Sequence, residues 1–287
     1  MKQFIVKLAI FLAIFWLADI CIGAGLEQLS QMSKGGTTYA ERYTADIATE
    51  EILIMGSSRA NHHYIPSLIK DSLGMSCYNA GIDGNGIVLM YGKYKMLTKR
   101  YTPNVIIYDI SIFDIKNDDK TKYLGRLKPY YDYDGIKEIF NDVEWKETVK
   151  MEASKLYRYN STVTLLITNS TISKELGENG YQPLYRTMDY IPEPFEYETY
   201  ETDSLKLRYI EELITKCKGK TKLFFAISPN YFTRDTSNFS PIFDICAKHG
   251  IPVLTTATTV ISLRKLIYTK TGYTSTTKVH RNTQRLS

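Results

Sequence analysis

The chain has 287 residues, of which 44% are hydrophobic and 23% are charged. These proportions exclude a disordered, collagen-like or disulfide-framework protein, and the length suits one large domain with a tail or two small domains. The formal net charge of +5 comes from residues 255–287, which carry six basic side chains and no acidic one. Because the rest of the chain is nearly neutral, no basic stripe is visible and we expect no nucleic-acid partner.

Tyrosine is unusually common, with 23 residues. Aromatic surfaces suit sugars and interfaces, but tyrosine also fills ordinary cores because its ring buries much apolar area. We favour the second interpretation.

The four cysteines are widely spaced, with no CxxC pair and no Cys/His cluster. This spacing predicts buried free thiols and no zinc site. We expect no metal or cofactor. The residues are Cys21, Cys77, Cys217 and Cys246.

The N-terminal segment Phe4–Leu26 is almost wholly apolar, interrupted only by Lys7 and Asp19. It is long enough to cross a bilayer if Lys7 extends its ammonium to the interface. The uninterrupted run 8–18 has the size of a signal-peptide core, but no clean cleavage site follows. We therefore favour an uncleaved signal anchor over a cleaved signal peptide. A buried core helix is the third alternative, although such a helix would normally show a polar face.

The basic start of the chain predicts the orientation of this anchor. Lys2, Lys7 and the terminal amine favour a cytoplasmic N-terminus, so the domain would face the periplasm or the exterior from a single-pass inner-membrane helix. We assign residues 1–26 to the anchor. The polar residues 27–50, with glycines and several threonines, are expected to form a stalk.

From residue 51 to 254 short apolar runs alternate with helical patterns. This alternation predicts an α/β fold, a parallel sheet of about five strands flanked by helices in a flavodoxin-like three-layer arrangement. An irregular, tyrosine-rich insertion is expected at about 116–202. We expect strands at 51–55, 76–80, 104–110, 221–227 and 251–254, and helices at 61–73, 87–101 (apolar on one face), 145–159, 204–217 (capped by Asp203) and 241–249.

A candidate nucleophile follows the first expected strand, where the sequence reads Gly56-Ser57-Ser58-Arg59. A serine at the mouth of a helix has backbone amides without helical partners beside it, and the helix dipole favours an anion there. The Ser58 hydroxyl could attack an acyl carbon while nearby amides hold the oxyanion. The alternative is a plain serine N-cap.

The loop after the second expected strand favours the nucleophile over the plain N-cap. It reads Tyr78-Asn-Ala-Gly-Ile-Asp-Gly-Asn-Gly86, and the two loops together resemble the SGNH (GDSL-like) hydrolase family. Gly56-Ser57-Ser58 stands where that family has Gly-Asp-Ser, so the resemblance implies that Ser58 is the nucleophile. Asn79-Ala80-Gly81 resembles the second block, which implies that Gly81 supplies an oxyanion amide.

The larger pattern, MGSSRANHHY, CYNAGIDGNG and VIIYDISIFD, is similar to a membrane-anchored SGNH-like group from bacterial envelopes. The resemblance covers roughly residues 51–254. Two features depart from it. The family's third block usually supplies an asparagine after the third strand, but here none occurs between the end of that strand and Asn117, so Ser111 or backbone would substitute or the oxyanion hole is weaker. The closing Asp-x-x-His is absent, because no acidic residue follows Asp244.

A shifted reading frame would restore the closing motif. Residues 255–287 contain ten threonines and little periodicity. Read one base out of frame, the codons of Lys270-Thr271 permit GAC and those of Tyr273-Thr274 permit CAC, within a pattern D-x-x-H-L-N-N-K-G-A. Our hypothesis is that one base was lost or gained near Leu254, which makes 255–287 an off-pattern tail.

The other histidines are poor replacements for the missing base. His62 and His63 follow Ser58 on the same expected helix, where surface or interdomain packing is the plainer interpretation. His249 lies at a helix end, and His280 lies in the off-pattern tail.

Two functional hypotheses follow. The first is an SGNH-type serine esterase or acyltransferase, with an acylated envelope glycan or small ester as substrate and with little activity in this chain. The second is a non-catalytic envelope protein that binds glycan or a protein partner. Phosphate binding is a weaker third, since neither GxxxxGK[ST] nor GxGxxG is present.

Overall fold

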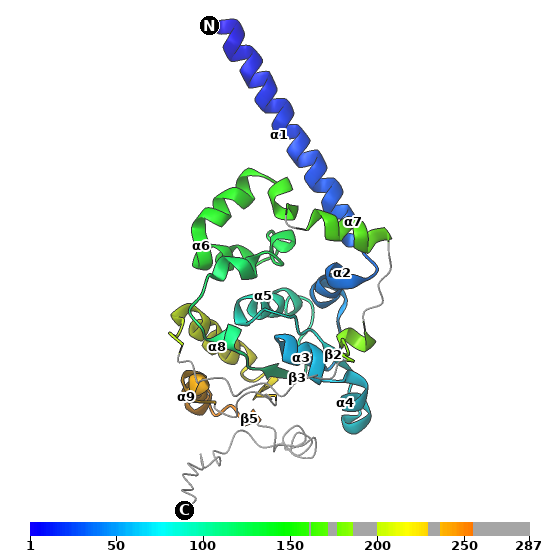
Figure 1. Ribbon diagram of the computed structural model, residues 1–287, viewed down its shortest axis with the longest axis vertical. Coiled ribbons are helices and arrows are strands. Elements are labelled where there is room, and N and C mark those ends of the chain that lie inside the picture. The colour runs from blue at the N-terminus through cyan, green and yellow to red at the C-terminus, as the bar shows by residue number, and fades with distance from the viewer. Residues whose placement is uncertain (161, 172–176, 186–199, 229–235, 255–287) are drawn as a thin grey trace, which may run out of the picture.

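The computed structural model describes residues 1–160, 162–171, 177–185, 200–228 and 236–254. Within them the protein is α/β, with a five-stranded sheet flanked by helices and a long apolar helix at the N-terminus (Figure 1). The expected tail 255–287, with the frame-shift hypothesis and His280, lies outside the described residues.

The sheet has the order β2-β1-β3-β4-β5, and every neighbouring pair is parallel. This confirms the predicted α/β class and the parallel sheet of five strands. All residues of β1, β2 and β3 are buried, as expected when helices cover both faces of a parallel sheet. The strands are β1 (Ile52–Gly56), β2 (Cys77–Asn79), β3 (Val105–Asp109), β4 (Lys222–Ala226) and β5 (Val253–Leu254).

Helices surround this sheet and form most of the remaining described structure. The α-helices are α1 (Lys2–Gln31), α2 (Gly36–Arg42), α3 (Ser58–His63), α4 (Pro66–Leu73), α5 (Ile87–Leu97), α6 (Ile136–Ala153), α7 (Val163–Thr171), α8 (Ser204–Cys217) and α9 (Ser240–His249). Short 3-10 segments are η2 (Ile112–Asp114), η3 (Lys120–Leu124), η4 (Lys128–Tyr130), η5 (Leu156–Tyr159), η6 (Glu178–Gly180) and η7 (Ser237–Phe239), and η1 (Tyr43–Ile47) is a π-helix.

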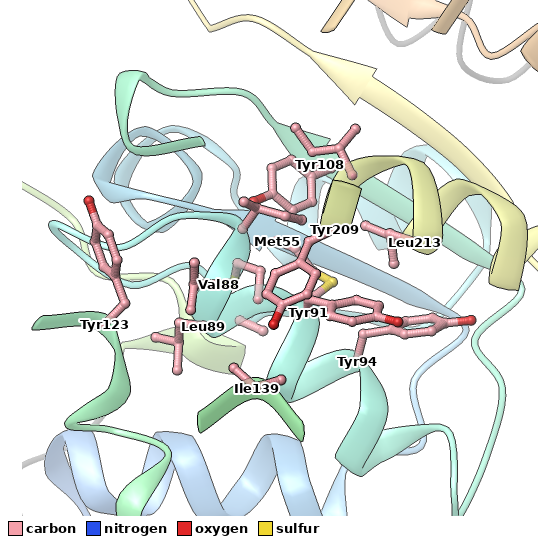
Figure 2. Packing of buried hydrophobic residues seen from close by; sticks show 14 of the residues in the cluster. Met55, Val88, Leu89, Tyr91, Tyr94, Tyr108, Tyr123, Ile139, Tyr209 and Leu213 are labelled. Atoms are coloured by element: carbon pink, nitrogen blue, oxygen red, sulfur yellow. The ribbon is translucent and has the colours of Figure 1, made fainter. Parts of the chain in front are cut away.

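The larger hydrophobic core lies on one face of the sheet, where α5 packs against β1 and α8. Tyrosine rings fill much of it: Tyr91 and Tyr209 are fully buried, with ring centroids 4.9 Å apart, and Tyr108 and Tyr123 are buried as well (Figure 2). These residues confirm the interpretation of tyrosine as core material. A smaller cluster on the other face joins the alternate strand residues to α3 and α4.

Helix α5 is more deeply buried than its sequence indicated. We expected apolar residues on one face, but all of its residues except Lys95 are buried. The cause is that α5 lies between the sheet and an outer layer formed by η1, η3 and α6, so neighbours surround it. Even Lys93 is fully buried, and its ammonium contacts Glu41 Oε2 at 3.0 Å and the Ala80 carbonyl at 3.1 Å.

The segment 27–50, expected to be a stalk, packs against the domain instead. It completes α1 and forms α2 and η1, and the small residues Ala40, Ala45 and Ala48 are buried. Polar composition misled the prediction because a buried ion pair satisfies the polar groups: Glu41 contacts both Lys93 and Arg126.

The expected helix 61–73 is two helices. Ile65 has extended backbone angles, φ −96° and ψ 109°, between α3 and α4. Pro66 explains the break, because its ring disfavours helical angles at the preceding residue.

The central region contacts the sheet at more than one place: η6 packs against β2, and hydrogen bonds join the two ends of the region. The Asn117 amide donates to the Glu201 carbonyl at 2.7 Å, and the Asp203 amide donates to the Ile115 carbonyl at 2.9 Å. The two ends of the predicted insertion therefore meet between β3 and α8. Its expected helix 145–159 is observed as α6, which begins earlier at Ile136, followed by η5.

Helix α1 has a mean hydropathy of 2.4 over its most apolar window, none of which is buried in the protein. By length and composition it can cross a membrane or serve as a signal sequence.

Candidate functional site

The candidate site lies where the sheet order reverses. From β1 the chain continues to β2 on one side, and β3 pairs with β1 on the other side. In open α/β sheets, ligands bind beyond the carboxyl ends of the strands at such a switch point. Gly56 ends β1 opposite Asp109, which ends β3. Ser57 and Ser58 therefore follow directly at the switch point.

Gly56 allows the chain to turn sharply here. Its φ of +138° is a backbone conformation that other residues rarely adopt, and an added Cβ would lie 2.5 Å from the Asp109 carbonyl oxygen. The turn leads into α3, with Ser57 at the N-cap and Ser58 as the first helical residue. Ser57 is buried and Ser58 is half-buried.

The loop of Gly81 lies beside the loop of Ser58. The Ile82 amide donates to the Gly56 carbonyl at 3.0 Å. A Cβ on Gly81 would lie 2.6 Å from the Asn61 backbone nitrogen and 2.8 Å from the Ala60 Cβ, so Gly81 packs directly on α3. The structure thus brings together the two segments that carry the predicted site residues.

Asn79 holds these two loops in place. Its side-chain amide donates to the Ala60 carbonyl at 2.7 Å and the Tyr64 carbonyl at 2.9 Å, and its Oδ1 accepts from the Gly81 amide at 3.0 Å. The Gly81 amide is therefore already a donor in this structure. An oxyanion at Ser58 would receive that amide only by sharing it with Asn79 or displacing it.

We expect Asn79→Ala to lower the free energy of unfolding by about 2–3 kcal/mol, because the substitution removes three hydrogen bonds of a buried amide and leaves their partners unsatisfied. The exposed Asn104→Ala is the matched control and should change it by about 0.5 kcal/mol or less. Urea denaturation of the full chain in detergent measures both. Equal losses in the two variants would contradict the role given to Asn79.

A buried polar cluster, which the sequence did not reveal, lies at the carboxyl ends of β3 and β4. Asp109 Oδ2 accepts hydrogen bonds from the Tyr64 hydroxyl at 2.7 Å, the Ser228 amide at 3.0 Å and the Ser228 hydroxyl. Arg59 Nε lies 3.5 Å from Asp109 Oδ1, and the guanidinium also donates to the Ile110 and Ser228 carbonyls.

Burial raises the pKa of Asp109, while Arg59 and the hydrogen bonds from Ser228 and Tyr64 oppose that rise. Each partner of the cluster thus supports the anionic form of a carboxyl that burial disfavours. The signal in the sequence was a polar residue at the end of an apolar strand, together with the arginine after Ser58. Their meeting depends on strand order, which one sequence does not give.

Ser111, the expected substitute for the third-block asparagine, does not supply an oxyanion donor. Its hydroxyl donates to Asp114 Oδ2 at 2.8 Å and its amide donates to the same oxygen at 2.7 Å. Because Ser111 is buried against Asp114, it supplies no donor toward Ser58.

No histidine in the described part of the chain is placed as a base for Ser58. His62 has both ring nitrogens engaged, Nδ1 with the Gln182 carbonyl at 2.6 Å and Nε2 with Asp83 Oδ2 at 3.0 Å. His63 lies about 140° around α3 from Ser58 at 100° per residue, and His249 contacts Glu211 on α8. The contacts of His62 agree with a packing role.

A pocket of about 370 Å³ lies elsewhere. Lys95, Lys99, Thr102 and Lys220 are among its lining residues, and the last two precede β3 and β4. It is therefore at the amino ends of the strands, opposite to Ser58, and gives no support to the candidate site. Among the described residues, no cluster of histidine, cysteine and acidic side chains could hold a metal ion.

No family model matches the chain, and no curated protein or solved structure matches it either.

Proposed function

We propose that the protein is a membrane-anchored serine esterase or acyltransferase of the SGNH type, acting on acyl groups of cell-envelope glycans and impaired in this chain. The observation that supports the proposal is the adjacency of the Ser58 and Gly81 loops at the switch point, given by the 3.0 Å bond from the Ile82 amide to the Gly56 carbonyl. Membrane anchoring by α1, with a cytoplasmic N-terminus, belongs to the same proposal.

In the proposed reaction the Ser58 hydroxyl oxygen attacks the acyl carbon and its proton passes to a base. The alcohol of the substrate leaves with a proton from that base, and an acyl-enzyme remains. Water or an acceptor hydroxyl then takes the acyl group and returns the proton to Ser58. Backbone amides at the start of α3 and in the Gly81 loop would stabilise the oxyanion. Since α3 has only six residues, these local amides matter more than a helix dipole.

The proposed reaction needs a general base that this chain does not supply. The Asp-x-x-His of the family is absent from the encoded chain, and His62 is held by Asp83 and Gln182. Members of a catalytic triad act as a unit, so the loss of one lowers the rate by several powers of ten.

An assay with a short-chain aryl ester tests the impairment. We expect the full chain in detergent to hydrolyse the ester at a rate close to that of its Ser58→Ala variant. Turnover at an ordinary esterase rate that Ser58→Ala abolishes would contradict the impairment, because another base would then serve Ser58.

The second candidate is a non-catalytic glycan-binding protein. The engaged Gly81 amide and the inward-turned Ser111 favour it, since both remove donors from an oxyanion hole. Binding of acylated envelope glycan that survives Ser58→Ala, without release of acyl groups, would support this candidate over the first.

A further inference from the structure

Helix α1 is fixed to the rest of the protein in its C-terminal half. Asp19 accepts hydrogen bonds from the Lys155 amide at 2.7 Å, the Leu156 amide at 3.3 Å and the Ser154 hydroxyl. One turn later, Gly23 is buried, and an added Cβ would lie 2.5 Å from the Lys155 Cβ. The start of η5 is therefore held at one level of α1.

The length of α1 sets the depth of this contact in a membrane. From Phe4 to Asp19 the helix rises about 22 Å at 1.5 Å per residue, whereas a hydrocarbon core is about 30 Å thick. If α1 crosses with its basic start at one surface, Asp19 lies about 8 Å short of the far boundary of the hydrocarbon core. The domain then cannot stand away from the membrane, because Ser154–Leu156 is bonded to α1 at that level.

The elements beside this contact expose large apolar side chains. Helix α6 contacts η5, and α7 contacts α1, at the end of the domain where α1 emerges (Figure 1). Trp145 and Val149, one turn apart on α6, are 61% and 54% exposed, and Leu165 on α7 is 47% exposed. We call these three residues the α6–α7 apolar surface.

We propose that the α6–α7 apolar surface lies in the headgroup region of the bilayer that α1 crosses. The proposal rests on membrane spanning by α1, and it is independent of the esterase chemistry. Tryptophan is enriched at membrane interfaces because its ring is apolar while its N–H can still bond to water or headgroups. Burial of the three side chains in lipid would also explain why about half of each is exposed in the protein alone.

Depth-dependent quenching tests the proposal. The full chain, with exposed Cys21 replaced in a Cys21→Ser background, carries one fluorescent label at Val149→Cys or Leu165→Cys. It is reconstituted in phosphatidylcholine vesicles that contain spin-labelled lipid. Ile10→Cys on α1 reports insertion of the anchor. Leu68→Cys on α4, 59% exposed, is the control away from α1.

We expect lipid spin labels near the headgroup to quench the labels at 149 and 165, deeper spin labels to quench position 10, and neither to quench position 68. Quenching at 10 with positions 149 and 165 as bright as 68 would overturn the proposed surface and leave the anchor intact. Absence of quenching at 10 would overturn the anchor and this proposal together.

Discussion

Glu41→Ala should lower the free energy of unfolding by about 3–5 kcal/mol, because it leaves the Lys93 ammonium buried without its carboxylate. Lys93 is fully buried, and burial lowers its pKa while Glu41 opposes the shift. The carboxylate also contacts Arg126 at 3.3 Å, so one side chain of α2 neutralises two cations. Urea denaturation of the full chain in detergent measures the loss.

Two further variants show whether the loss comes from the buried charge of Lys93. Lys93→Met should cost less, because Glu41 keeps Arg126 and the methionine fills an apolar site. Glu138→Ala is the matched control: Glu138 is 62% exposed and pairs with Lys95 at 3.4 Å, and a surface pair contributes about 0–1 kcal/mol. A loss at Glu41 no larger than that at Glu138 would show that residues 27–50 form a detachable stalk after all.

The second large effect is a gain of activity. If the frame-shift hypothesis is right, a single-base change near the codon of Leu254 that introduces D-x-x-H should raise ester hydrolysis by roughly 10³-fold or more over the encoded chain, since it would supply the base that the proposed mechanism lacks. The measurement is initial rate on a short-chain aryl ester, with both proteins at equal concentration in detergent. If the gene's third bases do not permit GAC and CAC in the shifted frame, the frame-shift hypothesis is wrong.

Local signals predicted the elements that frame the sheet. Asp203 caps α8 as expected, accepting from the amides of Leu205 and Lys206, and α9 ends at Gly250 with φ +67°. These features depend on neighbouring residues, so the sequence carries them directly. The apolar strands were equally clear, because strands buried on both faces are continuous hydrophobic runs.

Contacts between distant residues were not predictable in this way. The pairing of Glu41 with Lys93 made a polar segment part of the domain, and the meeting of Arg59, Asp109 and Ser228 depends on β1, β3 and β4 being neighbours. The same limit applies to the candidate site. Its two loops were expected to meet, but the hydrogen bond from Gly81 to Asn79 appears only in three dimensions.

We propose Ser58, rather than a neighbouring group, as the nucleophile beside the Gly81 loop. The most direct test of this proposal compares Ser58→Ala with Ser57→Ala in the frame-restored chain. Ser57 is a fitting control because its hydroxyl is buried and has no hydrogen-bond partner among the described residues. We expect Ser58→Ala to remove the gained ester hydrolysis and Ser57→Ala to keep most of it. Undiminished hydrolysis in folded Ser58→Ala would contradict the proposal.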